Sequence, residues 1–284
     1  MAIRPPAVAG MFYESRPERL ESDVRGYLTP PAAPPEPDSG APGARAPRAL
    51  GAIVPHAGYV YSGPVAGAVY SRLVIPASVV ILCPNHTGRG APAALDPSEA
   101  WRTPLGDVPR DESLADRILS LAPSLETDAE AHRREHSLEV QLPFLQVLRP
   151  DVRLVAISLG RPDLNLCREL GEALGSLADA DDAAGPPLLL LASSDMNHYE
   201  SRSVGRRKDD LALSRVAAID PEGLFRVVLE ESISMCGFLP ATALLYAARA
   251  AGAKTTRVVA RRDSGDETGD TSSVVGYAGV VVGF

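Results

Sequence analysis

The sequence predicts an α/β fold in which a central, mostly parallel or mixed sheet is flanked by helices on both faces. Several apolar, β-rich runs are continuous rather than alternating, as expected of strands that are covered on both sides. These runs alternate with segments of helical periodicity, which favours a layered sheet. The length of 284 residues and the 45% hydrophobic composition suffice for a large core, and a single domain over residues 1–284 is the simplest interpretation.

The first helix is expected over residues 15–28, before a segment that cannot pack. Ser15 is a suitable capping residue, and Pro17 suits the first turn of a helix. Residues 29–48 then carry seven prolines and almost no apolar side chains that could join a core. This composition predicts a proline-rich surface insertion.

The remaining strands and helices alternate along the chain. The expected strands lie at residues 50–54, 78–83, 152–159, 187–192, 256–260 and 274–282. The expected helices lie near residues 63–73, 112–121, 136–149, 163–178, 205–218, 221–231 and 239–251. Ser62 is expected to cap the first of these helices, and the next is expected to start at Asp111. Ligands of such sheets bind at the carboxyl ends of strands, so the residues that follow each strand are the candidates for a site.

Composition argues against several classes of function. A net charge of −8 disfavours a nucleic-acid partner, because binding to phosphates needs a basic face. The basic run 202–208 leads straight into two aspartates and is interpreted as a solvated helix start. No apolar stretch approaches the ~18 residues that span a bilayer, and the first residues do not resemble a secretory signal. We therefore expect no membrane association. Three cysteines make no disulfide framework, which predicts a cytoplasmic location.

Three of the five histidines lie just past expected strand ends. His56 follows the first strand in PHAGY, His86 follows the second in CPNHTG, and His198 lies in SSDMNHY after the fourth. A fourth, His136, opens an expected helix in REHSLE. Imidazole is a ligand for Fe, Zn, Cu and Ni, and two histidines with one anion form the open face of non-haem Fe(II) sites. We therefore expect these histidines to converge on a metal.

The anionic ligand has three candidates, namely Asp195, Glu139 and Cys236. Cys236 lies between two expected helices beside Gly237, where backbone can approach a site closely. A free cysteine is more commonly a small buried apolar residue, which is the expectation for Cys83 and Cys167. Spacing alone does not choose between Cys236 and Asp195.

Seven motifs, in order, resemble those of the Memo family, also called AmmeMemoRadiSam system protein B. They read PAVAGMFY, VPHAGYVYSG, CPNHTG, TPLGDV, EHSLEVQLPFL, SSDMNHY and MCGF. They run from about residue 4 to the C-terminus, with the proline-rich segment as an insertion. The resemblance implies a fold like that of class III extradiol (LigB-type) dioxygenases. It also implies a site in which cysteine replaces the dioxygenase carboxylate.

The resemblance assigns roles to six residues of this chain. His56, His86 and Cys236 become the metal ligands. Asp195, His198 and His136 match residues that line the same pocket, where they could move protons during catalysis. The implied metal is Fe(II), with Zn and Cu as alternatives.

Three functions remain open on this basis. The first is a metal-dependent oxidoreductase, dioxygenase-like but with an unknown substrate, since a thiolate is itself oxidisable and ordinary catechol cleavage does not follow. The second is a binding module for metal, a small molecule or a peptide. It would act through a partner such as the radical-SAM protein that the resemblance implies. The third is a zinc hydrolase, which needs a bound water and a nearby base.

Overall fold

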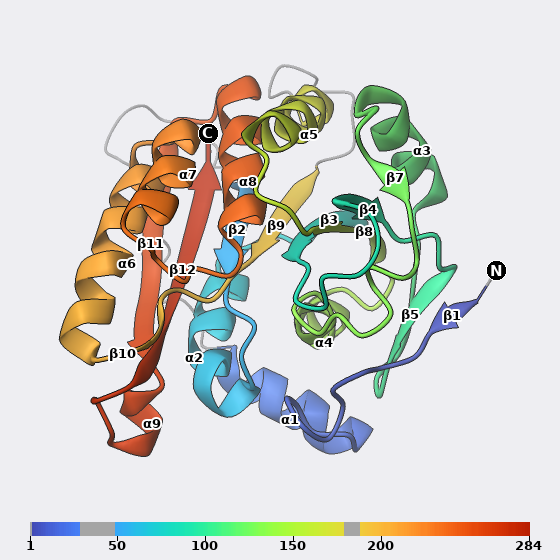
Figure 1. Ribbon diagram of the computed structural model, residues 1–284. Helices are drawn as coiled ribbons and strands as arrows, with labels where there is room; N and C mark the ends of the chain where they lie inside the picture. The colour runs from blue at the N-terminus through green and yellow to red at the C-terminus, as the bar shows by residue number, and fades with distance from the viewer. Residues whose placement is uncertain (1, 29–48, 179–187) are drawn as a thin grey trace, which may run out of the picture.

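A mixed sheet of nine strands forms the centre of the computed structural model, which describes residues 2–28, 49–178 and 188–284 (Figure 1). The predicted insertion at residues 29–48 lies outside the described residues. Across the sheet the strands are β10 (His198–Glu200), β12 (Val274–Gly283), β2 (Ala49–Val54), β9 (Leu189–Ser193), β3 (Ser78–Pro84), β8 (Arg153–Leu159), β4 (Ala93–Leu95) and β7 (Glu126–Thr127), with β11 (Thr255–Asp263) paired to β12. A smaller sheet contains β1 (Ile3–Arg4), β5 (Ala100–Thr103) and β6 (Gly106–Pro109).

The middle of the large sheet is parallel and its borders are mixed. Strands β2, β9, β3 and β8 run parallel to one another. Strand β12 is antiparallel to β2, and β4 is antiparallel to β8. The expected α/β class with a mixed sheet is therefore confirmed. Parallel strands end at one edge of a sheet, so the turns after β2, β3 and β9 lie near one another.

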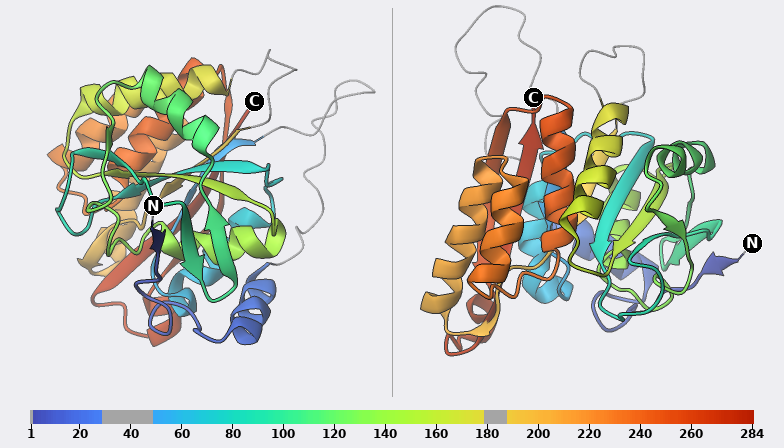
Figure 2. Two further views of the ribbon diagram at one scale, coloured as in Figure 1. Left: turned by 90° about the vertical axis from the view of Figure 1, so that its right-hand side faces the viewer. Right: turned by 45° about the horizontal axis from the view of Figure 1, so that its top comes forward.

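Helices cover both faces of this sheet (Figure 2). One face carries α3 (Glu112–Leu121), α5 (Leu164–Leu177), α6 (Arg202–Ala217), α7 (Pro221–Glu230) and α8 (Phe238–Ala250). The other carries α1 (Pro17–Tyr27), α2 (Tyr59–Tyr70), the 3₁₀ turn η1 (Glu139–Gln141) and α4 (Leu142–Leu148). A single-turn helix, α9 (Gly265–Thr268), follows β11. No helix within the described ranges is both long and apolar enough to cross a membrane.

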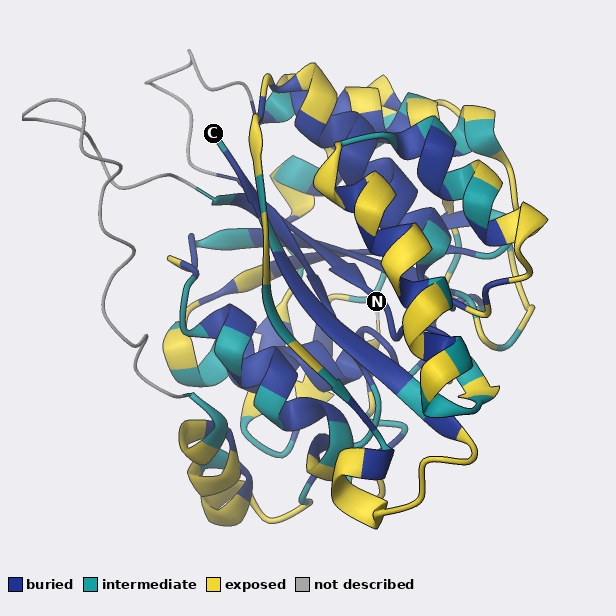
Figure 3. Ribbon diagram, turned by 90° about the vertical axis from the view of Figure 1, so that its left-hand side faces the viewer, coloured by how far each residue is buried: buried dark blue, intermediate teal, exposed yellow. Residues whose placement is uncertain are grey.

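The two helical layers explain why the strands are apolar at successive positions. In β3, Val80 and Leu82 pack into the core on the α5 and α8 face, whereas Val79 and Ile81 pack into the core on the α2 and α4 face. All four are fully buried. Figure 3 shows the central strands buried along most of their length and the helices exposed on their outer sides. A continuous apolar run is thus what a strand between two layers requires.

Two predicted helix caps are wrong. Helix α1 starts at Pro17, with Arg16 at its N-cap and no capping side chain, so Ser15 does not cap it. Helix α2 starts at Tyr59 after Gly58, three residues before Ser62, whose hydroxyl donates to the Ala57 carbonyl at 2.7 Å. The cap of α3 is as expected, because the Asp111 carboxylate accepts from the Leu114 amide at 3.0 Å.

The helix expected over residues 136–149 is shorter, and His136 lies in the turn before it. The Glu135 carboxylate accepts from the Ser137 amide at 2.9 Å and from the Ser137 hydroxyl at 2.7 Å. Such side-chain bonds to backbone compete with helix formation. Regular α-helix begins only at Leu142, followed directly by Pro143, which suits a first turn.

Candidate metal centre

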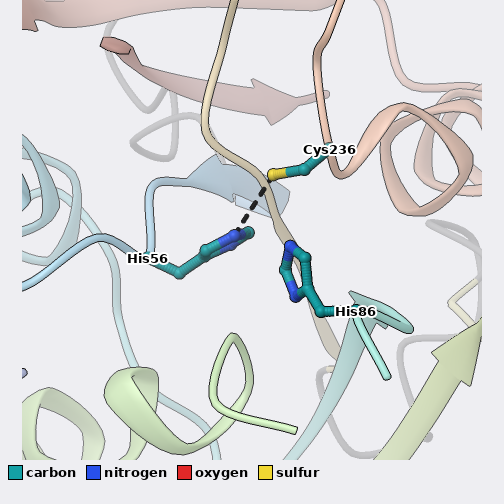
Figure 4. Close-up of side chains that lie close together, drawn as sticks. All are labelled: His56, His86 and Cys236. Atoms are coloured by element: carbon teal, nitrogen blue, oxygen red, sulfur yellow. Dashed lines mark hydrogen bonds between the residues drawn. The ribbon is translucent and has the colours of Figure 1, made fainter. Parts of the chain in front are cut away.

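Three side chains from distant parts of the chain meet at the carboxyl edge of the sheet. His56 follows β2, His86 follows β3, and Cys236 lies between α7 and α8. One donor atom from each lies within 4.8 Å of the other two. Figure 4 shows the two imidazole rings and the sulfur pointing toward a common point. The Cys236 Sγ atom lies 3.2 Å from Nε2 of His56.

Gly237 lets the cysteine segment approach the end of β9. A Cβ atom at this position would lie 2.2 Å from the Ser193 carbonyl oxygen and 2.4 Å from the Ser194 Cβ. The Gly237 amide donates to the Ser194 hydroxyl at 3.1 Å, and the Asp195 amide donates to the Cys236 sulfur at 3.3 Å. Only glycine fits this contact, which places the sulfur beside His56.

A hydrogen-bond network fixes which nitrogen of His56 carries its proton. The Ser193 hydroxyl donates to the Ser137 carbonyl at 2.6 Å and accepts from the Gln141 amide at 3.0 Å. Gln141 also donates to the Pro55 carbonyl, which orients its amide. The Ser193 oxygen also lies 3.0 Å from Nδ1 of His56. Because the proton of this hydroxyl is already donated to Ser137, the oxygen must accept a hydrogen bond from Nδ1–H of His56. Nε2 of His56 is left unprotonated and faces Cys236.

Glu135 does the same for His86. Its carboxylate lies 2.9 Å from His86 Nδ1 and accepts from the His86 amide at 2.7 Å. Burial raises the pKa of Glu135, but the bonds from His86 and Ser137 outweigh it and hold that pKa at about 2. An ionised carboxylate only accepts hydrogen bonds, so Nδ1 of His86 carries a proton, and in the neutral imidazole Nε2 is the nitrogen left for a metal. A histidine ligand oriented by a carboxylate is a common arrangement at metal centres.

The charges of the group follow from its burial. Burial, together with the neighbouring His86 and His136, holds the pKa of His56 well below its usual value. Burial lowers the pKa of His86 too, but the bond to Glu135 and its charge raise the pKa overall. Burial and the nearby Asp195 carboxyl raise the pKa of the Cys236 thiol. The Cys236 thiol therefore donates to Nε2 of His56 in the absence of metal, and a metal ion would replace that proton.

This donor set fits a transition metal. Two imidazoles with free Nε2 atoms and one sulfur suit Fe, Zn or Cu, and the geometry favours Cys236 over Asp195 as the third ligand. Asp195 lies beside the group: its carboxylate accepts from the His56 amide at 2.7 Å. Burial raises the pKa of Asp195 to about 7, and its carboxylate is 4.0 Å from His56 Nε2. With His56 neutral, this contact is not an ion pair.

The three other residues named from the sequence all border the same cavity. This cavity has a volume of about 1110 Å³ and is lined by Asp195, His136 and His198 as well as by His56, His86 and Cys236, which form the proposed metal-binding group. The His136 ring stacks on His86 with centroids 4.6 Å apart. Burial lowers the pKa values of both His136 and His198. Their catalytic roles stay predictions.

The remaining candidates lie elsewhere. Glu139 was a candidate anion, but its buried carboxylate binds the Arg4 guanidinium at 2.7 Å and the Tyr13 hydroxyl at 2.7 Å. Cys83 and Cys167 are buried, as expected. His132, the one histidine without a predicted setting, bonds the Ala94 carbonyl through Nε2 at 2.9 Å.

Sequence reasoning missed the residues that orient the ligands. The sequence patterns assign no role to Glu135, Ser193 or Gln141. Their signals are weak: Ser193 is the first polar residue after an apolar strand, and Gln141 is a lone amide among leucines in EHSLEVQLPFL.

The comparisons with known proteins agree with one another. The family model described as Memo-like protein matches residues 4–281. A MEMO1 family protein of Ignicoccus hospitalis is 42% identical, covering 99% of this chain and 98% of that protein. Those of Pyrobaculum arsenaticum and Methanopyrus kandleri are 41% and 40% identical, covering 99% and 98% of this chain and 99% and 98% of their own lengths.

A solved structure is similar in fold alone. The crystal structure of an uncharacterised protein of Escherichia coli K12 aligns with a TM-score of 0.54 at 14% identity, covering 82% of this chain and 100% of the other. The likeness to LigB-type dioxygenases stays a prediction. The family assignment rests instead on the sequence matches, which extend over nearly the whole chain. The chain belongs to the Memo family.

Proposed function

We propose that the chain is a metal-dependent oxidoreductase whose Fe(II) is held by Nε2 of His56, Nε2 of His86 and Sγ of Cys236. One observation carries the proposal: two imidazoles, each with Nδ1 committed to a fixed acceptor, present free Nε2 atoms to one sulfur. Two histidines and one anionic ligand leave coordination positions open, as in non-haem iron sites. When bound, Fe(II) would supply one-electron redox chemistry next to the cavity.

The residues around the metal-binding group would handle protons. Asp195, whose pKa is raised by burial to about 7 in the metal-free protein, is placed to exchange a proton with a group bound in the cavity. His198 and His136 border the cavity from two other elements and offer further imidazoles to a bound substrate. A positioned acid or base of this kind contributes ~10²–10⁴-fold to a rate.

The metal content of the purified protein tests the proposal. The wild type, purified without oxygen, should hold about one iron per chain, and His56→Ala, His86→Ala and Cys236→Ser should lose it. Cys167→Ser is the matched control, because it removes a buried thiol that lies outside the group. Iron retained in Cys236→Ser but lost in Asp195→Asn would overturn the ligand set. Zinc as the sole metal after growth with iron would instead favour a hydrolase.

Oxygen uptake separates an enzyme from a binding module. The iron-loaded protein should consume O₂ when supplied with substrates drawn from catechols, thiols and cell extract. Iron-loaded protein that consumes none with any of them would favour a module that binds a small molecule or peptide. Such a module would work through a partner such as a radical-SAM protein.

A further inference from the structure

Apolar side chains gather at the mouth of the cavity. Met11, Val60 and Tyr199 are exposed by 73%, 51% and 77%, and all three line the cavity at whose inner end the metal-binding group lies. Phe12 and Tyr277 line it as well. Exposed apolar side chains that cluster around one hollow are typical of a binding site rather than of ordinary surface.

Tyr199 is held at the mouth by an irregular backbone. Along β10, His198 pairs with Val275 and Glu200 pairs with Val274 of β12. Tyr199 between them is therefore an extra residue with no partner on β12. Its φ angle is 60°, in the left-handed region that residues other than glycine rarely adopt. The His198 amide anchors this bulge by donating to the Ser234 hydroxyl at 2.7 Å. Bulges beside active sites commonly re-aim one side chain, here an aromatic ring.

The charges around the cavity are acidic. Among the described residues that line it there is no lysine or arginine, whereas Glu14 and Asp23 are present. The Glu14 carboxylate is neutralised by Arg16, whose guanidinium lies 2.9 Å away. Asp23 is exposed on α1 and has no ion pair within the described part of the chain. Within the described part of the chain, the outer cavity therefore offers a negative charge without a paired cation, beside aromatic surfaces, and this disfavours an anionic ligand.

We propose that the cavity binds an organic ligand with a flat apolar body, which stacks on Tyr199, and a cationic outer end, which lies near Asp23. Aromatic rings stack on flat groups and attract cations through their faces, so tyrosines and a carboxylate together select such a molecule. The inference rests on the proposed function in one respect. The end of the ligand opposite its cation, which is the hydroxyl in a phenol, is directed toward the proposed metal.

Three matched phenols test the charge of the ligand. Tyramine, tyrosol and 4-hydroxyphenylacetate share one phenol body and carry a cationic, a neutral and an anionic end. Calorimetry on metal-free and iron-loaded protein should place tyramine first and 4-hydroxyphenylacetate last. The Kd should rise about two- to fivefold from tyramine to tyrosol and again from tyrosol to 4-hydroxyphenylacetate, which corresponds to the free energy of an exposed ion pair. Equal affinities, the reverse order, or no binding by any of the three would overturn the inference.

Variants locate the two contacts. Asp23→Asn should abolish the preference for tyramine over tyrosol, and Asp116→Asn, an exposed aspartate of α3 away from the cavity, should keep it. Tyr199→Asn, which tolerates the left-handed backbone, should weaken all three ligands, whereas Tyr199→Phe should not. A tyramine preference that survives in Asp23→Asn, or full affinity in Tyr199→Asn, contradicts the proposal.

The outcomes separate this inference from the proposed function. If the expected order appears in the metal-free protein while no iron is retained, the metal assignment fails and the ligand class stands. If iron binds as proposed but the order of the phenols is absent, the ligand class alone fails.

Discussion

At the scale of single residues, the centre depends on which imidazole nitrogen is free. His56 and His86 each commit Nδ1 to an acceptor, so both present Nε2. The acceptors differ in kind. Ser193 is a neutral hydroxyl, and the pKa of His56 stays well below its usual value because burial dominates. Glu135 is a carboxylate that raises the pKa of His86 despite burial. The two ligands therefore differ in basicity.

Replacing Glu135 tests this positioning. Glu135→Gln removes the negative charge and replaces one acceptor oxygen with an NH₂ group, which cannot accept the bonds from His86 and Ser137. His86 should therefore lose its fixed orientation. Metal affinity, measured by competition with a chelator, should fall by about 10- to 100-fold, as it does when other groups that hydrogen-bond a metal-ligating histidine are replaced. Glu130→Gln, a change in the same loop at a partly exposed side chain, is the control. Equal affinities for the two variants would show that Glu135 is not needed.

The candidate site could be predicted at this scale only in part. The motifs supplied His56, His86 and Cys236, and the structure brings their donor atoms together. The orienting partners did not follow from the sequence. Ser193, Ser137 and Gln141 meet only because a strand end and two segments of an irregular turn converge, and nothing in their spacing encodes that contact.

At the scale of elements, the long central strands were predicted better than the turns, and the short strands β1, β4, β5, β6, β7 and β10 were not predicted. The continuous apolar runs gave β2, β3 and β8 to within a residue or so, because burial on both faces leaves a strong pattern. The turn before α4 falls within the helix that was expected over residues 136–149. There the side chain of Glu135 binds backbone of its own segment, and that local competition leaves no periodic signal.

Replacing Gly237 tests the packing of elements, because this glycine lets the segment that carries Cys236 lie against the end of β9. Gly237→Ala would force its Cβ to within 2.2 Å of a backbone oxygen, so the segment that carries Cys236 must shift. We expect loss of metal binding and destabilisation by about 1–3 kcal/mol, the usual cost of overpacking. Gly26→Ala, in a helix position with open space around it, should bind metal normally and be no less stable. Chemical denaturation and metal content of the two variants decide between these outcomes.

At the scale of the whole molecule, the N-terminal segment is tied to the metal-binding group. The buried Arg4 guanidinium donates to the carbonyl oxygens of His132 at 2.8 Å and Glu135 at 2.6 Å. It also pairs with the buried Glu139 carboxylate. These bonds fix the turn that supplies Glu135 to His86. Phe12, a few residues further along, borders the cavity, so one segment both supports the centre and completes the pocket.

Buried Asp209 should give the stability of the molecule a characteristic pH dependence. It accepts from the Asn197 amide at 2.9 Å beneath β12, and burial raises its pKa from 3.8 to about 6. The folded state therefore holds this proton more tightly than the unfolded state. The contribution of Asp209 is most favourable below pH 3.8 and falls by about 2–3 kcal/mol as the pH rises to about 6.

Urea denaturation of the wild type and of Asp209→Asn over this range measures that contribution. The free energy of unfolding of the wild type relative to the variant should fall as the pH rises through the window and be flat above it. Asp210→Asn, at the exposed neighbouring carboxylate, should show no such trend. A difference between wild type and Asp209→Asn that stays constant across the window would contradict the burial of an ionising group at this position.

The most direct test of the metal centre is X-ray absorption spectroscopy at the metal edge of the loaded protein. The account predicts one sulfur neighbour at about 2.3 Å and histidine nitrogens at about 2.0–2.1 Å, using zinc distances as the guide, with the sulfur lost in Cys236→Ser. A metal surrounded by nitrogen and oxygen alone in the wild type would contradict the His56, His86 and Cys236 assignment.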